Sequence, residues 1–226
     1  MVFRPAPDGI PFRPTGNHQM HPTEVLPAKK QQALTDAVTL LRYSEVIAAP
    51  TDTVYGLVCR YDSSEAIAEL YRVKDRPPEK ALPVLIGDES QLTQVIVGPL
   101  PALAAELIAR FWPGPLTLIL PALPHLPPVL TAGGSTVGVR IPNQPFLREL
   151  ARRAGPLASS SANRSGGPEC STAAEVLAQL NGRIPLLVDG GPTPLGQAST
   201  VLDLTVTPPR ILREGPLGET VRGLLG

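Results

Sequence analysis

The stretch Val73–Lys80 (VKDRPPEK) marks the joint between an expected helix and an expected strand, and it carries three cations. Lys74 and Arg76 are two residues apart, so in an extended segment their side chains leave on the same side. Pro77 favours an extended Arg76 before it. Arg offers a planar fork of donors and Lys a compact charge. With Lys80 close by, the stretch is typical of a polyphosphate site. The alternative is that these are solvated loop charges.

Helices and strands are expected to alternate on both sides of this stretch. Apolar residues recurring at helical spacing and the flanking stop signals predict helices at 29–43, 63–72, 88–95, 101–111, 145–153 and 218–225, with a further helix opening at Thr172. Short apolar runs predict strands at 45–50, 82–87, 116–120, 137–141, 156–159, 184–188, 199–204 and 210–213. This alternation predicts an α/β fold, a single domain with a twisted mixed β-sheet flanked by helices.

Two helices have candidate capping boxes at their starts. Asp62 and Glu65 have the spacing of an N-cap residue and its partner three positions later, and so do Thr172 and Glu175. Residues 1–28, by contrast, contain scattered prolines and few apolar anchors. We therefore expect a flexible N-terminal extension over 1–28 and the folded domain over 29–226.

Composition excludes several functional classes. The 20 Lys and Arg residues balance the 20 Asp and Glu residues, so no global field favours nucleic acid or an anionic membrane. The two cysteines are far apart in the sequence and indicate neither a disulfide framework nor a zinc site. The sequence also lacks an apolar run long enough to span a membrane. We expect a cytoplasmic protein without a membrane partner.

Hydroxyl-rich segments follow two of the predicted strands. Thr51, Asp52 and Thr53 follow the strand at 45–50, where α/β folds often bind ligands, although they could equally be ordinary turn residues. The segment 159–167 (SSSANRSGG) follows another strand and resembles an anion-holding loop in its physics. It lacks the G-K-[ST] of a Walker A motif, and the alternative is a polar turn.

Arg140 and Trp112 stand out among apolar neighbours. A buried arginine needs a partner, and a carboxylate of the protein or one of a ligand would serve Arg140. Trp112 precedes the rigid turn PGP at 113–115 and is expected to pack beneath it, with base stacking as the minor alternative.

Several separated motifs occur together in a characteristic order: PTDTVYGL at 50–57, KDRPPEK at 74–80, WPGPLT at 112–117, VRIP at 139–142, SANRSG at 161–166, and STVLDL at 199–204 with ILREG at 211–215. In this order they resemble the YrdC/Sua5 family of threonylcarbamoyl-AMP synthases. The resemblance covers about residues 33–215 and is closest to the short, single-domain YrdC type.

The resemblance implies an enzyme, a nucleotidyltransferase that converts L-threonine, bicarbonate and ATP into L-threonylcarbamoyladenylate and pyrophosphate. Lys74 and Arg76 would then act catalytically. The residues implied in threonine binding are Thr53, Arg140, Ser161 and Ser199, and those implied in nucleotide binding are Arg76, Lys80, Asn163, Ser171 and Arg213. The family pattern implies no dedicated protein metal site, and Mg2+ would arrive with ATP.

The resemblance also implies partners. The adenylate would serve a downstream tRNA threonylcarbamoyl-transferase complex that modifies tRNA position 37. Weak RNA binding through the same cations is left open, and the alternative function is a non-catalytic RNA-binding protein. Two departures matter for the site. Leu85 stands where some relatives place a polar residue, so it is left out of the site, and Cys170 is expected to be a small apolar filler.

Overall fold

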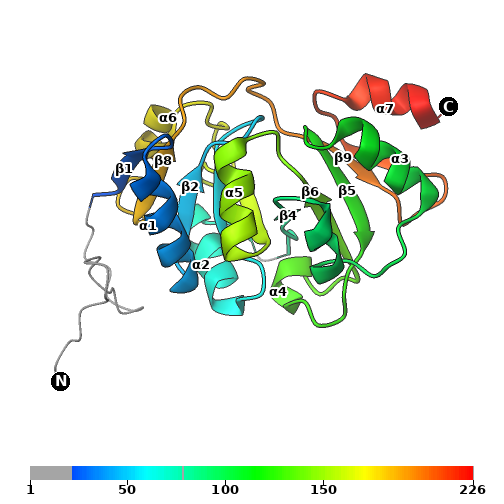
Figure 1. Cartoon of the computed structure of the whole chain (residues 1–226), viewed down its shortest axis with the longest axis horizontal. Helices are drawn as coiled ribbons and strands as arrows, with labels where there is room; N and C mark the ends of the chain where they lie inside the picture. The colour runs from blue at the N-terminus through cyan, green and yellow to red at the C-terminus, as the bar shows by residue number, and fades with distance from the viewer. Residues whose placement is uncertain (1–21, 78, 226) are drawn as a thin grey trace.

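The computed structural model describes residues 22–77 and 79–225, and its centre is a mixed, ten-stranded sheet (Figure 1). The strands are β1 Glu24–Pro27, β2 Ile47–Ala49, β3 Gly56–Arg60, β4 Val84–Leu85, β5 Leu116–Pro121, β6 Thr136–Arg140, β7 Leu157–Ser161, β8 Leu186–Asp189, β9 Thr200–Asp203 and β10 Arg210–Arg213. Their order across the sheet is β1-β8-β2-β3-β7-β4-β6-β5-β9-β10. Pairs β1/β8, β2/β8, β4/β6 and β5/β9 are parallel, and the others are antiparallel. The predicted α/β fold class is confirmed.

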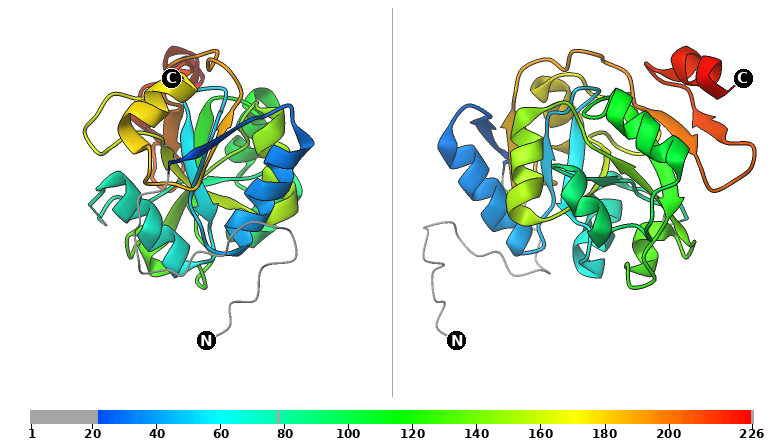
Figure 2. Two further views of the ribbon diagram at one scale, coloured as in Figure 1. Left: turned by 90° about the vertical axis from the view of Figure 1, so that its left-hand side faces the viewer. Right: turned by 45° about the vertical axis from the view of Figure 1, so that its right-hand side comes forward.

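Helices cover both faces of this sheet. They are α1 Gln31–Arg42, α2 Ser64–Lys74, α3 Ala102–Phe111, α4 Pro128–Thr131, α5 Pro145–Ala154, α6 Ala173–Leu180 and α7 Gly218–Leu225, with a 3-10 helix at Glu89–Gln94. Figure 2 shows α1 and α5 together on one side of the sheet and α2 and α6 on the other. None of the helices in the described part of the chain is long and apolar enough to cross a membrane.

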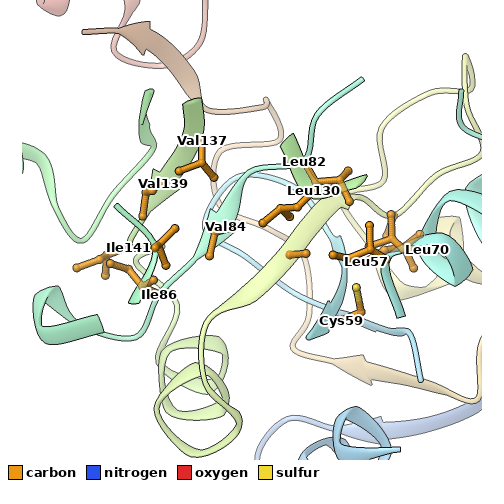
Figure 3. Close-up of a cluster of buried hydrophobic side chains, with 14 of the residues drawn as sticks. Leu57, Cys59, Leu70, Leu82, Val84, Ile86, Leu130, Val137, Val139 and Ile141 are labelled. Carbon is orange, nitrogen blue, oxygen red and sulfur yellow. The ribbon is translucent and has the colours of Figure 1, made fainter. Parts of the chain in front are cut away.

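The alternation of side chains along the strands divides the core in two. In β2, Ile47 and Ala49 belong to the cluster beneath α1 and α5, whereas Ala48 between them belongs to the cluster on the other face. Figure 3 shows part of that second cluster, in which side chains of β3, α2, β4 and β6 come together. Trp112 is buried beneath the turn at 113–115, as predicted, and its Nε1 donates to the Leu116 carbonyl oxygen.

Two strands lie where the sequence predicted none. Strand β3 was missed because the T-D-T turn and Gly56 indicated a loop, whereas Gly56 in fact pairs with Ala49 in β2 and with Ser161 in β7. Strand β1 falls inside the expected flexible extension, yet it runs parallel to β8, and Thr23 just before it is buried. The sheet therefore includes Glu24–Pro27 of the expected extension, and residues 1–21 of that extension lie outside the described residues.

The limits of helix α2 also correct the prediction. Its N-cap is Ser63, whose hydroxyl accepts from the Ala66 main chain, while Asp62 pairs with Arg60 instead. The capping box predicted from Asp62 and Glu65 is therefore wrong. The one predicted at the start of α6, from Thr172 and Glu175, is confirmed.

Three further boundaries differ from the prediction. The strand expected at 82–87 shrinks to β4, Val84–Leu85, and the helix expected at 88–95 is the 3-10 helix, which Asp88 caps through Ser90. Strand β7 continues to Ser161, so this serine stands at the strand end and not in a loop.

Candidate functional site

Lys74 is the last residue of α2, and only 3% of it is exposed. Its Nζ donates 2.7 Å hydrogen bonds to the main-chain oxygens of Ser161 and Asn163 and to Oδ1 of Asn163. The Ser161 hydroxyl lies further away, at 3.3 Å. An ammonium has three donors, so the three close acceptors use them all. Lys74 thus ties the end of α2 to the end of β7.

The backbone at Asp75 explains why Lys74 turns inwards. Asp75 has a φ of 53°, in the left-handed region, and terminates α2. A short polar side chain tolerates this conformation. The Arg76 main-chain N–H then donates back to the Tyr71 carbonyl oxygen at 2.9 Å. The extended segment that would carry Lys74 and Arg76 on the same side is therefore absent, because α2 ends between them.

The Asp75 carboxylate joins three segments of the chain. Its Oδ2 accepts from Arg164 at 2.6 Å and from Arg183 at 3.0 Å, and both guanidinium groups hold the pKa of Asp75 below its usual range. The Lys74 carbonyl oxygen also accepts from the Ser165 main chain at 2.8 Å. The K-x-R motif (residues 74–76) and the segment that begins with the S-x-N motif (residues 161–163) are therefore joined to each other by side-chain and backbone contacts.

Arg76 and Lys80 form the accessible part of the cationic stretch. The Arg76 guanidinium lies along the loop and donates to the carbonyl oxygens of Lys80 and Ala81, each at 3.2 Å. The Lys80 residue itself is exposed. Burial, reinforced by the neighbouring Arg76 charge, lowers the pKa of Lys74 to about 8. Arg76 and Lys80 are thus the two cations of the stretch that a ligand can reach.

Arg140 is buried and finds its carboxylate within the protein. It ends β6, where it ion-pairs through Nη2 with Oδ1 of Asp52. It also donates from Nη1 to the Thr53 hydroxyl at 3.0 Å and from Nε to the Gly114 carbonyl oxygen at 2.9 Å. Burial lowers the pKa of Arg140, and Asp52 opposes this effect. Of the two partners left open by the sequence, the structure supplies a protein carboxylate.

The T-D-T turn presents Asp52 and Thr53 to Arg140. The Thr51 hydroxyl accepts from the main-chain N–H groups of Thr53 and Val54, at 2.9 and 3.2 Å, and donates to the Val54 carbonyl oxygen at 2.7 Å. A threonine side chain thereby replaces the backbone hydrogen bonds of a regular element. All three residues of the turn are buried, so its hydroxyls are fixed in place.

A third group of predicted residues gathers at the start of β9. Arg213, in β10, donates to the Ser199 hydroxyl at 3.0 Å and to its carbonyl oxygen at 2.9 Å. The Ser199 hydroxyl also lies 2.8 Å from the Thr117 hydroxyl. Arg213 is close enough to Arg140 for its charge to lower the pKa of that residue. This group therefore adjoins the Arg140 group.

Ser171 lies at the N-terminus of α6. Its main-chain N–H donates to the Glu175 carboxylate at 2.6 Å, and its carbonyl oxygen accepts from the Thr193 main chain at 2.8 Å. Cys170, just before it, is fully buried, and burial raises the pKa of its thiol to about 11. An inert, buried thiol fits the expected filler role. Leu85 is also buried, in the apolar cluster beneath α1 and α5.

A cavity of about 420 Å³ lies beside the Arg140 group. It is lined by Asp52 and Gly114, which both bind Arg140, and by Trp112, Asn143 and Leu195 among others. Lys74 and Arg213 do not line it. The cavity therefore reaches the Asp52 side of the site only, whereas the predicted phosphate-binding cations lie elsewhere.

The structure thus brings the predicted residues into three linked groups: Lys74 with Ser161 and Asn163, Arg140 with Thr53, and Arg213 with Ser199. Gly56 links the first two, because it pairs with Ser161 just after the T-D-T turn. Sequence reasoning missed Asp52 as the partner of Arg140. The signal was present, since Asp52 lies within a quoted motif and Arg140 required a carboxylate.

Fold and site together define an α/β domain whose mixed sheet carries a linked cluster of arginine, lysine and hydroxyl side chains. The family model described as "Telomere recombination" (Sua5, YciO, YrdC) matches residues 39–215. The chain belongs to this family.

Relatives and a solved structure agree with that assignment. The chain is 44% identical over 196 residues to a threonylcarbamoyl-AMP synthase of Bacillus subtilis, covering 85% of this chain and 56% of that protein. A threonylcarbamoyl-AMP synthase of Chromohalobacter salexigens is 39% identical over 172 residues, covering 76% of this chain and 92% of the relative. The crystal structure of Pyrococcus abyssi Sua5 complexed with L-threonine superposes with a TM-score of 0.85 at 36% identity, over 90% of this chain and 61% of that one. The chain therefore spans just over half the length of the Bacillus relative.

Proposed function

We propose that this chain is a threonylcarbamoyl-AMP synthase, which forms L-threonylcarbamoyladenylate and pyrophosphate from L-threonine, bicarbonate and ATP. The observation that carries the proposal is the buried Arg140, which keeps donors to spare beside the Thr53 hydroxyl. Arginine has five N–H donors, and Arg140 uses three of them on Gly114, Thr53 and Asp52. Its two remaining donors suit the carboxylate of an amino acid. The relative crystallised with L-threonine supports this choice of ligand.

The chemistry needs positioned charge more than a protein nucleophile. Bicarbonate loses hydroxide to give CO2, the threonine amine adds to CO2 and loses a proton to give a carbamate, and the proton and hydroxide leave as water. A carbamate oxygen then attacks the α-phosphorus of ATP while the bond to pyrophosphate breaks. Negative charge develops on the phosphate oxygens during this step, so cations aimed at them lower the barrier. In this proposal Arg76 and Lys80 supply them, which the exposure of Lys80 and the position of Arg76 along the same loop support.

Lys74 has a different task in this proposal. Its three donors are committed to Ser161 and Asn163, so it acts chiefly by holding those residues and by adding charge behind them. The direct phosphate contacts then fall to Arg76, Lys80 and Arg213. Thr53, Ser161 and Ser199 would contact threonine, and Asn163 and Ser171 the nucleotide.

We propose that Mg2+ arrives bound to ATP. The described residues hold no group of three or more His, Cys, Asp and Glu side chains with the spacing of a metal site. Mg2+ keeps several waters and is commonly bound through substrate phosphates with one or two carboxylates. The residues present therefore fit a cation that the nucleotide brings with it, and that cation would neutralise phosphate charge.

We also propose that the adenylate passes to a tRNA threonylcarbamoyl-transferase complex in the cytoplasm, where ATP and tRNA are present. Direct, weak RNA binding stays a prediction. It should weaken steeply with added salt, because it would rest on phosphate contacts. ATP binding should instead depend on Mg2+ and strengthen with threonine.

The deciding experiment is pyrophosphate release, with threonine, bicarbonate and Mg2+ each present or omitted. We expect release to require all of them, and Arg76→Ala to lower the rate by about 10²–10³. The control variant is Arg72→Ala, because Arg72 lies about one helical turn earlier, is exposed and pairs with Glu69. Release that continued without threonine, or an Arg76→Ala rate equal to that of the control, would contradict the proposal.

A further inference from the structure

The Asp52 carboxylate has one oxygen in use and one free of protein partners. Oδ1 binds Arg140, whereas Oδ2 is buried and finds no hydrogen-bond donor among the described residues. The Asp52 side chain is only 5% exposed. A buried charged oxygen left without a donor is costly, and native proteins rarely keep one without a function. Oδ2 therefore lacks a hydrogen-bond donor that a bound ligand could supply.

The position of this carboxylate is fixed from two sides. Its main-chain oxygen accepts from the Leu195 main chain at 3.2 Å, and its Oδ1 is held by Arg140. The neighbouring Thr53 is held by the Thr51 hydroxyl, as described above. Oδ2 cannot turn away to solvent without breaking these contacts. It stays close to the Arg140 guanidinium, and Asp52 is one of the residues that line the cavity.

The free oxygen of Asp52 and the spare donors of Arg140 match the two charged ends of one kind of ligand. In an α-amino acid the carboxylate and the amine are attached to the same carbon. A ligand whose carboxylate binds the two spare N–H groups of Arg140 would therefore bring its amine close to the carboxylate that pairs with Arg140. The amine is a donor, which is what Oδ2 lacks.

We propose that Asp52 is a specificity-determining residue of the amino-acid site: one oxygen orients Arg140, and the other accepts a hydrogen bond from the amine of the substrate. This inference rests on the proposed function and deepens it, since it gives the substrate amine a partner. It also explains why the ion pair is buried, because an exposed carboxylate would be satisfied by water and would discriminate poorly.

The test compares two ligands that differ in the amine alone. L-threonine and (R)-3-hydroxybutyrate share the carboxylate and the hydroxyl, but the second has no amino group. Their affinities for the wild-type chain and for Asp52→Asn are measured by calorimetric titration. We expect the wild type to prefer threonine by at least about tenfold, the worth of a hydrogen bond to a charged group. In Asp52→Asn this preference should fall to near unity.

The ratio of the two affinities distinguishes a hydrogen bond between Asp52 and the substrate amine from a role of Asp52 in holding Arg140 alone. If Asp52 only held Arg140 in place, both affinities would fall together and the preference for threonine would persist, which overturns the inference. Partial unfolding of the variant does not disturb the test, since it lowers the number of active sites without changing the ratio. The matched control is Asp62→Asn, which removes a carboxylate charge from the exposed ion pair with Arg60 and should keep the wild-type ratio.

Two wild-type results are also decisive. Equal affinity for threonine and (R)-3-hydroxybutyrate would overturn the inference while leaving the proposed function standing, since the carboxylate would still be recognised. A wild-type chain that binds neither ligand, and that releases no pyrophosphate with threonine present, would refute the proposed function and this inference with it.

Discussion

The Nζ atom of Lys74 lies 2.7 Å from both the main-chain oxygen and the side-chain oxygen of Asn163, a residue 89 positions later in the chain. Two motifs that are remote in sequence therefore share one ammonium group. Because the ammonium is buried, neither motif can shift without leaving a charged donor or a carbonyl oxygen unpaired. The lysine sets the position of the S-x-N segment on which the proposed nucleotide site depends.

The lowered pKa of Lys74 should be visible in stability as pH changes. Its pKa falls from 10.5 in the unfolded chain to about 8 in the folded protein. Between these values the unfolded state binds more protons, so stability rises with pH. The comparison is with Lys74→Gln, which keeps two N–H donors and has no charge. Relative to this variant, the free energy of unfolding of the wild type should rise by up to about 3 kcal/mol between pH 7 and pH 10.5.

Urea unfolding of both proteins across this pH range measures the difference. Lys80→Gln is the control, since Lys80 is exposed, and its stability should follow that of the wild type at every pH. A constant gap between wild type and Lys74→Gln would show that Lys74 does not titrate in this window.

The buried pair of Arg140 and Asp52 should be far more costly to break than an exposed one. Arg140→Met leaves the Asp52 carboxylate buried without its partner, and we expect a loss of about 3–5 kcal/mol in the free energy of unfolding. Arg60→Met breaks the exposed pair with Asp62 and should cost about 0–1 kcal/mol. Chemical denaturation compares the two. Equal losses would mean that Asp52 is hydrated once Arg140 is removed.

The N-cap of α2 distinguishes the observed geometry from the one predicted from sequence. Ser63→Ala removes the hydroxyl that accepts a hydrogen bond from the Ala66 main-chain N–H, and it should lower the free energy of unfolding by about 1 kcal/mol. Asp62→Ala removes only the surface ion pair with Arg60, and it should lower the free energy of unfolding by about 0.5 kcal/mol or less. Thermal unfolding of the two variants decides between them. A larger loss for Asp62→Ala would restore the capping box that the structure rejects.

Asp75 combines a left-handed backbone with a bridging carboxylate, and two substitutions separate these roles. Asp75→Gly keeps the backbone conformation without strain and removes the bridge to Arg164 and Arg183. Asp75→Ala removes the same bridge and adds strain. We expect the alanine variant to unfold at the lower temperature. Equal melting temperatures would show that the backbone conformation is not strained for alanine.

A second comparison isolates the carboxylate. Because both variants lack the bridge, pyrophosphate release should fall in both, as the S-A-N-R segment loses one of its fastenings to α2. If Asp75→Gly kept the wild-type rate, the Lys74 side-chain hydrogen bonds and the backbone contact between Lys74 and Ser165 would suffice to hold the site.

Local patterns in the sequence predicted most elements of the fold, while contacts between distant residues account for the errors. The helix expected at 29–43 is found at Gln31–Arg42, because its apolar stripe is a local property. Strand β3 was missed because the evidence for it lies in β7, where Ser161 pairs with Gly56. Strand β1 was missed for the same reason, since its partner β8 comes much later in the sequence.

The candidate site shows the same division. Lys74 and Arg140 could be selected from local signals in the sequence, namely a cationic stretch after a helix and an arginine within an apolar strand, whereas Ser199 was selected only through the family resemblance. The exposure of these residues could not be predicted from the sequence. Lys74 looked like a loop cation and is buried, since its acceptors come from another segment. Asp52 was passed over because its importance depends on the fold bringing the end of β6 against the T-D-T turn.

The order of strands in the sheet has a consequence for how the protein is made. Strand β1 pairs with β8, and Glu24 is among the first described residues to be synthesised. This edge of the sheet therefore cannot form until Leu186 has been synthesised. Lys74 likewise waits for Asn163, and Arg213 is needed to complete the last group of the site. Topologies dominated by such distant pairings fold slowly. A nascent chain on the ribosome can therefore hold neither the finished sheet nor the site until the residues up to Arg213 have been synthesised.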